Sequence, residues 1–302
     1  MKQDLREFAK LGFAHFMLWP TCVADSNQLT RTLSQFVQRG DLEALDCCLP
    51  FGHDNRQDLA RLIRDADLEV VYAPHVFPTM KIAMSSPADN EQALVRLAME
   101  DQIEAAASIG ATGMIIVSGP DVAAAERPRA RQAFADLCCW ICGKIKPHGM
   151  TAMIEPFDRD FDKRFLYGPT AECVELIESL APEVDNLGIQ LDMAHVPLMG
   201  ETFEQAIRTV ALHLQHVHLG NCVMENTSDP FYGDRHPPIG YEGGVIDVPQ
   251  VAEILSLLLD TGYLDETERG VLIIEAQPFP GLTVDQTIED NLQRVHQAWR
   301  MV

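Results

Sequence analysis

Gln215-His216-Val217-His218-Leu219-Gly220-Asn221 is a short apolar stretch that ends in a histidine and then breaks at a glycine. Three other runs of strand-forming residues end similarly, each delivering one metal-binding type of side chain at its C-terminal end: Met153-Ile154-Glu155-Pro156, Gln190-Leu191-Asp192-Met193-Ala194-His195 and Ile273-Ile274-Glu275-Ala276. Around these four runs, apolar strand-like segments alternate with amphipathic helical segments along the whole chain, which is typical of a parallel α/β fold.

The alternation predicts eight strands and eight helices. We expect strands at residues 12–18, 42–47, 69–73, 113–118, 150–155, 187–192, 214–219 and 271–275. We expect helices at residues 28–39, 56–65, 89–109, 127–146, 170–180, 203–212, 249–261 and 284–300. Eight such units without a linker-like segment predict one closed (β/α)8 barrel, a single domain over residues 1–302. An open doubly wound sheet is disfavoured, because no Gly-x-Gly-x-x-Gly follows the first strand.

The composition predicts a globular protein and excludes several partners. Of the 302 residues, 47% are hydrophobic and 23% are charged, which allows a sizeable core. The net charge of -22 repels a phosphate backbone, so we expect no nucleic-acid partner. The sequence has no apolar run of 18 or more residues and no apolar signal core near Met1, so we expect a soluble, cytoplasmic protein without a membrane partner.

Two further patterns are assigned to the core. The eight cysteines are adjacent to one another or lie in apolar runs, and we expect them to be reduced. Cys139-Trp140-Ile141-Cys142 has the spacing of a redox or zinc pair, but no second pair follows, so packing of a helix is the preferred interpretation. In the helix at 89–109, the spacing of Leu94, Leu97 and Ile103 suggests its apolar stripe.

In a barrel of this type, the active site lies at the C-terminal ends of the strands. We therefore expect Glu155, Asp192, His218 and Glu275 to converge from four consecutive strands and to bind one divalent metal ion. One such residue alone would as readily be a helix cap or an ion-pair partner, and the ordered set of four carries the prediction. Three carboxylates and one imidazole suit Mn²⁺ first or Mg²⁺, with Co²⁺ and Zn²⁺ also compatible.

Other residues near these strand ends have predicted roles. The three carboxylates exceed the charge of a divalent ion by about one, so a nearby cation is expected, with His195 or Arg235 as candidates. His216 lies one layer deeper than His218 and is expected to be its hydrogen-bonded neighbour. His15 and Trp19, at the end of the first expected strand, are candidates for lining the pocket, although core packing explains them equally well.

The ordered set Ile154-Glu155-Pro156, Leu191-Asp192-Met193-Ala194-His195, His216-Val217-His218 and Ile274-Glu275 resembles the xylose isomerase-like TIM barrels, the sugar phosphate isomerase/epimerase superfamily. It is most similar to the ketose 3-epimerase branch. The resemblance covers nearly the whole chain, and Ala73-Pro74-His75 also fits, which adds His75 to the candidate substrate contacts.

The resemblance implies that the four residues bind the metal and that the two glutamates act as base and acid on opposite sides of a substrate carbon. It also implies that His195 contacts a substrate oxygen. The expected reaction is isomerisation or epimerisation of a sugar through an enediolate, which a metal bound to the carbonyl stabilises and which needs no redox cofactor. We expect a small-molecule sugar substrate, a role in carbohydrate metabolism and a homo-oligomer.

Two departures from the epimerase pattern leave the substrate open. The epimerases have an arginine soon after the metal histidine, whereas here the nearest candidate, Arg235, lies 17 residues beyond His218. The segment after Glu155 reads Asp158-Arg159-Asp160-Phe161-Asp162, where the family places a polar substrate contact. Either this loop is rebuilt for a different substrate, or its polar residues only organise the loop.

Three alternatives therefore stay open. A metal-dependent lyase resembling the catalytic subunit of C-glycoside deglycosidases would act on 3-keto-glycosides with a small partner subunit, and the long loop at 221–246 would suit its larger substrate or a partner. A nuclease resembling endonuclease IV would need three zinc ions and a basic rim, which the net charge of -22 argues against. A non-catalytic binding barrel would contain no metal.

Overall fold

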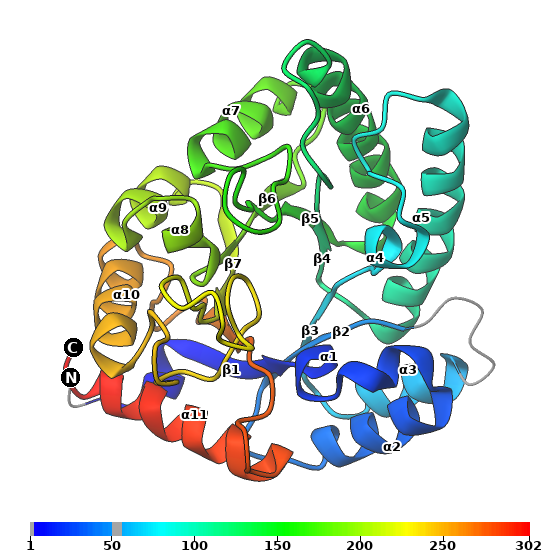
Figure 1. Ribbon diagram of the computed structural model, residues 1–302. Coiled ribbons are helices and arrows are strands. Elements are labelled where there is room, and N and C mark those ends of the chain that lie inside the picture. The colour runs from blue at the N-terminus through cyan, green and yellow to red at the C-terminus, as the bar shows by residue number, and fades with distance from the viewer. Residues whose placement is uncertain (1–2, 50–55) are drawn as a thin grey trace.

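A computed structural model of the chain describes residues 3–49 and 56–302. Eight parallel strands form a closed barrel in chain order, with the last strand paired to the first (Figure 1). The strands are β1 (Ala9–Ala14), β2 (Ala44–Cys47), β3 (Glu69–Tyr72), β4 (Gly113–Ile116), β5 (Thr151–Ile154), β6 (Leu187–Asp192), β7 (Leu214–Leu219) and β8 (Gly270–Ile274). The predicted TIM-barrel fold is confirmed.

The helices surround the barrel (Figure 1). The longer ones are α2 (Ser26–Val37), α3 (Arg56–Arg64), α5 (Asp89–Ile109), α6 (Arg127–Ile145), α7 (Thr170–Leu180), α9 (Phe203–Val210), α10 (Val248–Asp260) and α11 (Val284–Trp299). Each faces the strands with an apolar side that the barrel buries. None of the described helices is both long and apolar enough to cross a membrane.

Three short helices, absent from the sequence prediction, follow strand ends directly: α1 (His15–Leu18), α4 (Val76–Met80) and α8 (His195–Leu198). The prediction that residues 15–18 continue the first strand is wrong, because β1 pairs with β2 only as far as Ala14. A short apolar run cannot be assigned to strand or helix by periodicity alone. Short 3-10 helices occur at Leu5–Glu7, Pro20–Ala24 and Lys146–His148.

The apolar face of α5 also differs from the expected one. Leu94 and Leu97 are 45% and 66% exposed, whereas Val95, Met99 and Ile103 are buried. Because these three residues are spaced four apart, they form one stripe of the helix against the barrel. The two leucines therefore face the solvent. The prediction that they belong to the apolar stripe is wrong, because it relied on their hydrophobic character.

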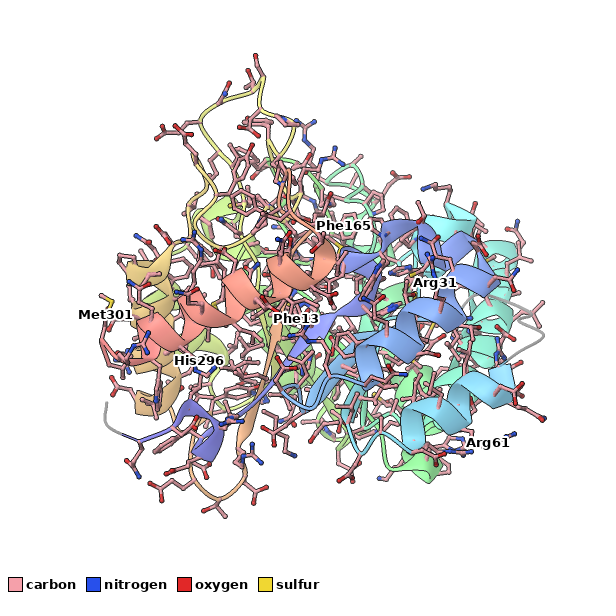
Figure 2. All side chains as sticks on the ribbon, turned by 90° about the horizontal axis from the view of Figure 1, so that it is seen from below. Phe13, Arg31, Arg61, Phe165, His296 and Met301 are labelled. Atoms are coloured by element: carbon pink, nitrogen blue, oxygen red, sulfur yellow. The ribbon has the colours of Figure 1, made fainter. Side chains whose placement is uncertain are left out.

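The register of the strands places the candidate side chains at one level. Asp192 of β6 lies beside His218 of β7, and His218 lies beside Ile273 of β8. The same end of the barrel carries the long loop between β7 and α10, which Figure 2 shows projecting beyond the barrel on the side of Phe165. This loop ends in Asp247, whose side chain forms a capping box at the start of α10.

Candidate metal centre

Four buried side chains converge at the C-terminal ends of consecutive strands. Asp192 is the last residue of β6, His218 lies in β7, and Glu155 and Glu275 directly follow β5 and β8. One ligand atom from each of the four lies within 4.8 Å of the others. The structure therefore brings together the four side chains that the sequence pattern selected.

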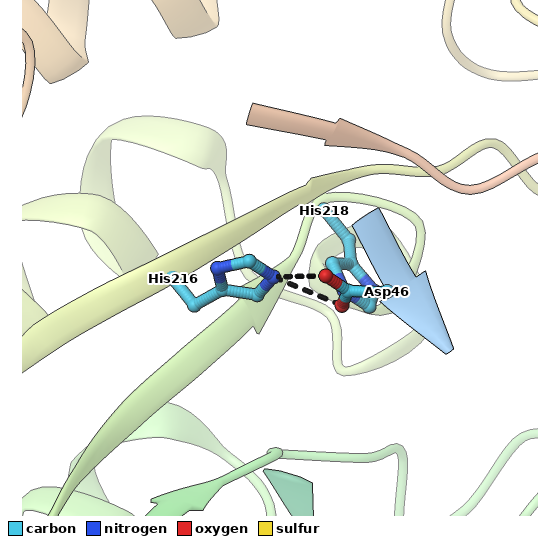
Figure 3. Close-up of side chains that lie close together, drawn as sticks. All are labelled: Asp46, His216 and His218. Atoms are coloured by element: carbon cyan, nitrogen blue, oxygen red, sulfur yellow. Dashed lines mark hydrogen bonds and ion pairs between the residues drawn. The ribbon is translucent and has the colours of Figure 1, made fainter. Parts of the chain in front are cut away.

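His218 is held on both sides of its ring by carboxylates. Its Nδ1 lies 2.5 Å from Glu275 Oε2, and its Nε2 lies 2.8 Å from Oδ2 of Asp46. Asp46, in β2, is completely buried and is also bound by Nε2 of His216 at 2.9 Å (Figure 3). The expected role of His216 as a hydrogen-bonded neighbour is confirmed, whereas Asp46 was missed. Its signal in the sequence is a single carboxylate within the apolar strand Ala44-Leu45-Asp46-Cys47.

A second group of polar side chains lies against Asp192 on the loop side. His195 Nε2 is 3.4 Å from Asp192 and 3.3 Å from Asp234, and His236 Nε2 is 2.7 Å from Asp234. Asp192, His195 and His236 are also close enough together to hold a metal ion. Asp234 and His236 come from the long loop and were not selected from the sequence. His236 has a φ of 49°, a backbone conformation that non-glycine residues rarely adopt.

The donor set fits a divalent cation. Asp192 Oδ1 accepts the amide of Ala194 at 2.8 Å, whereas its Oδ2 is buried without a hydrogen bond and has only longer ion-pair contacts, 3.4 Å to His195 and 3.6 Å to His236. A carboxylate oxygen that is withdrawn from water without a hydrogen bond is costly, and coordination of a metal ion would offset that cost. Gly220 permits the close packing, because a Cβ there would overlap the Asp192 carboxylate. The residues present therefore match the chemistry of a hard divalent ion.

The two glutamates have very different proton affinities. Burial raises the pKa of Glu155 to about 8. Burial acts in the same direction on Glu275, but His236 and His218 outweigh it and lower the pKa of Glu275 to about 2. Before any cation binds, the pKa values of the two carboxyl groups are therefore shifted in opposite directions, which is the asymmetry that an acid and base pair needs.

The positive charge near the carboxylates comes from histidines. Burial alone would lower the pKa of His195, but Asp234 and Asp192 raise it to about 10. For His236, Glu275 and Asp234 likewise outweigh burial and raise the pKa to about 9. Of the two cations suggested by the sequence, His195 is therefore the one in contact with the carboxylates, whereas Arg235 is exposed at the cavity edge.

A cavity of about 530 Å³ opens over the four converging side chains. His75, His195 and Arg235, the candidate substrate contacts, are among the residues that line it. The structure does not bring His15 and Trp19 to this cavity. His15 is buried on the outside of the barrel wall, where its Nε2 lies 3.0 Å from Thr32 Oγ1 and its ring packs against that of Trp19.

Comparison with known proteins agrees with this architecture. The sequence profile of the family described as xylose isomerase-like TIM barrel matches residues 5–295. The chain belongs to this family. A crystal structure of a D-tagatose 3-epimerase-like protein superposes with a TM-score of 0.69 at 19% identity, covering 95% of this chain and 98% of that one. A 3-keto-D-glucoside 4-epimerase from E. coli superposes with a TM-score of 0.70 at 14% identity and the same coverage.

One curated relative, the 2-oxo-tetronate isomerase of Pectobacterium atrosepticum strain SCRI 1043, is 20% identical over 153 residues. The match covers 49% of this chain and 58% of the relative, so the chain spans somewhat over half the length of the curated relative that it matches. These likenesses establish the shared xylose isomerase-like fold.

Two loops of this xylose isomerase-like barrel close one side of the cavity. Asp158 is buried, and its carboxylate accepts the backbone amides of Phe161, Asp162 and Lys163 at 2.7, 2.7 and 2.8 Å. Asp162 Oδ2 in turn accepts the amide of Asp234 at 2.9 Å, which links this loop to the long loop after β7. Asp162 and Lys163 reach the cavity. The structure thus shows that Asp158 organises the loop, and it leaves open whether Asp162 and Lys163 contact a substrate.

The cysteines of the chain behave as the sequence predicts. All eight are free thiols, and each except Cys139 is buried. Burial raises the pKa of the Cys142 thiol to about 12, so it is not a ready metal ligand.

Proposed function

We propose that this chain is a divalent-metal-dependent sugar isomerase or epimerase that moves a proton on the carbon next to a carbonyl group. The observation that carries the proposal is the convergence of Glu155, Asp192, His218 and Glu275, whose ligand atoms lie within 4.8 Å of one another under an open cavity. Membership of the xylose isomerase-like family and the fold shared with sugar epimerases support it.

The metal ion would be held by these four residues, with Mn²⁺ as the expected ion and Mg²⁺, Co²⁺ or Zn²⁺ as the others that the donor set accepts. Bound there, it would supply charge that stabilises an enediolate. Asp192 and His218 are proposed as ligands without a part in proton transfer. Asp46 orients His218 from the side opposite Glu275.

Glu155 and Glu275 are proposed as the acid and base pair. They project from β5 and β8, and their oxygens lie within 4.8 Å of each other, so both reach one substrate carbon. One takes the proton from carbon and the other returns a proton to the resulting enediolate. His195 is proposed to donate to a substrate oxygen, because its ring lines the cavity and its Nε2 makes no hydrogen bond, only ion-pair contacts of 3.4 Å with Asp192 and 3.3 Å with Asp234.

A second candidate function is a lyase that acts on 3-keto-glycosides, with the protein as the catalytic subunit of a hetero-oligomer. It would use the same four residues to deprotonate beside the 3-keto group and expel the aglycone. The observation that favours it is the long loop after β7, which contributes Asp234, Arg235 and His236 to the cavity. Turnover of a 3-keto-glycoside without any reaction of free ketoses, or a stable small partner subunit, would favour the lyase over the isomerase. For the isomerase, we propose a homo-oligomer in the cytoplasm.

The test is exchange of substrate protons with solvent deuterium, followed by NMR, across a panel of ketoses and 3-keto-glycosides with Mn²⁺ present. The wild-type protein is expected to label the carbon beside the carbonyl of at least one compound. Glu155→Gln and Glu275→Gln are each expected to lower the exchange rate at least a hundredfold. Glu253→Gln, an exposed residue of α10, is the matched control. Undiminished exchange in both site variants would refute the mechanism.

A further inference from the structure

The cavity has two sides of unlike chemistry. The side formed by the ends of β5 to β8 carries the carboxylates and histidines described above. The other side is formed by residues that follow β1 and β3 and by the end of β4, and it is almost entirely apolar: Phe16, Met17, Ala73, Phe77, Ile115 and Val117. A substrate that fills the cavity therefore meets polar groups at one end and hydrocarbon at the other.

Aromatic rings connect the two sides without a break. The ring of Phe77 lies 5.5 Å from that of Phe165, which lies 4.7 Å from that of Phe157. The ring of Phe157 lies 4.1 Å from that of His195, beside the metal ligands. The apolar surface thus begins next to the proposed reaction centre and extends outward to α4.

Among the residues that the structure describes, the apolar side offers little to a hydroxyl group. The polar side chain that they place there is His75, whose Nδ1 lies 3.5 Å from Cys48 Sγ and whose ring packs edge-on against Phe16. Burial lowers the pKa of His75 to about 4, so the ring is uncharged at neutral pH. A sugar hydroxyl placed among the remaining side chains would lose its water without gaining a partner, which is unfavourable.

We propose that the substrate of this site is a sugar carrying an apolar, ring-sized substituent, and that the side formed by Phe16, Phe77 and Val117 binds this substituent. The assignment of the polar side to the sugar rests on the proposed function. A cavity of about 530 Å³ lies in the range that holds ligands larger than a free sugar. Burial of a phenyl ring between Phe77 and Val117 supplies binding energy that a methyl group does not.

The test compares matched pairs of phenyl and methyl β-glycosides of glucose, galactose and xylose, with binding measured by calorimetry in the presence of Mn²⁺. For at least one sugar, the phenyl glycoside is expected to bind at least tenfold more tightly, a difference of about 1.4 kcal/mol. Equal affinities within every pair, or no binding of any phenyl glycoside, would overturn the proposal. These probes need no turnover, so the result is independent of whether proton exchange occurs.

Two variants locate the subsite. Phe77→Ser is expected to lower the ratio of phenyl to methyl glycoside affinity at least tenfold. Val117→Thr, which keeps the side-chain shape, should lower this ratio at least threefold. Both residues are half-buried, so the fold should tolerate them. Leu97→Ser, an exposed residue of α5, is the matched control and should change nothing. Mn²⁺ affinity should be unchanged in all three, and a preference that survives both cavity variants in full would refute the assignment.

Discussion

Nε2 of His218, in β7, lies 2.8 Å from Oδ2 of Asp46, in β2, so a buried hydrogen bond crosses the interior of the barrel. Because Nε2 donates to Asp46, Nδ1 is the nitrogen that faces Glu275 and the other carboxylates. Carboxylates that hold a metal-binding histidine in this way fix its tautomer and increase its basicity. Asp46 is therefore as much a part of the candidate metal centre as the four converging residues.

Asp46→Asn is expected to weaken Mn²⁺ binding by about 10- to 100-fold, because the amide keeps the shape but no longer carries the charge that orients and polarises His218. Calorimetric titration of the purified protein with Mn²⁺ measures this directly. Asp136→Asn, on the exposed face of α6, is the control. An Asp46→Asn protein that binds Mn²⁺ like the wild type would show that the hydrogen bond serves the fold alone.

The four converging residues could be predicted from the sequence, because each lies at the end of a recognisable strand pattern. Asp46, on the opposite strand β2, could not. β6 and β7 were assigned with their observed bounds, because β6 is an apolar run that ends at Asp192 and β7 is one that a glycine, Gly220, interrupts. Asp46 was overlooked because its role depends on a contact across the barrel, 172 residues away from His218 in the chain, which no local pattern encodes.

In the long loop after β7, too, the roles of residues depend on contacts that the local sequence does not reveal. Asp234 and His236 enter the site only because His236 adopts a positive φ and because Asp162 binds the amide of Asp234. Arg235, between them, has the residue type that a sugar site suggests, yet its side chain is exposed. Residue type alone could not separate these three neighbours, since their orientation is set by contacts between two loops.

Asp158→Ala is expected to loosen the loop after β5. The substitution leaves the amides of Phe161, Asp162 and Lys163 without their acceptor, which should lower the free energy of unfolding by about 1–3 kcal/mol. Thermal denaturation and limited proteolysis within residues 158–166 measure the effect. Mn²⁺ affinity should stay unchanged, because Asp158 touches none of the metal ligands.

The control for this loop is Asp160→Ala, two residues further on and exposed, which should change the unfolding free energy by less than about 0.5 kcal/mol. If the two variants behave alike, the loop does not depend on the Asp158 carboxylate.

His15 should make the fold sensitive to mild acid. Burial lowers its pKa from 6.5 to about 3, so the unfolded chain binds more protons than the folded one between these values, and stability falls as the pH falls through that window. His15→Gln can still donate to Thr32 but cannot titrate. Between pH 7.5 and pH 5, the wild type should lose about 2 kcal/mol more unfolding free energy than the variant. Urea denaturation at both pH values tests this, and equal losses would show that His15 titrates normally in the folded protein.

The most direct test of the central claim is a titration with Mn²⁺, read by calorimetry and by metal analysis after dialysis. We expect one ion per chain in the wild type, and at least a hundredfold weaker binding in both Asp192→Asn and His218→Ala, with circular dichroism unchanged. His236→Gln should weaken binding far less than these two variants, because His236 lies near Asp192 and Glu275 but is not one of the four converging residues. Absence of binding in the wild type, or loss of the ion in His236→Gln with retention in His218→Ala, would contradict the assignment of the metal to Glu155, Asp192, His218 and Glu275.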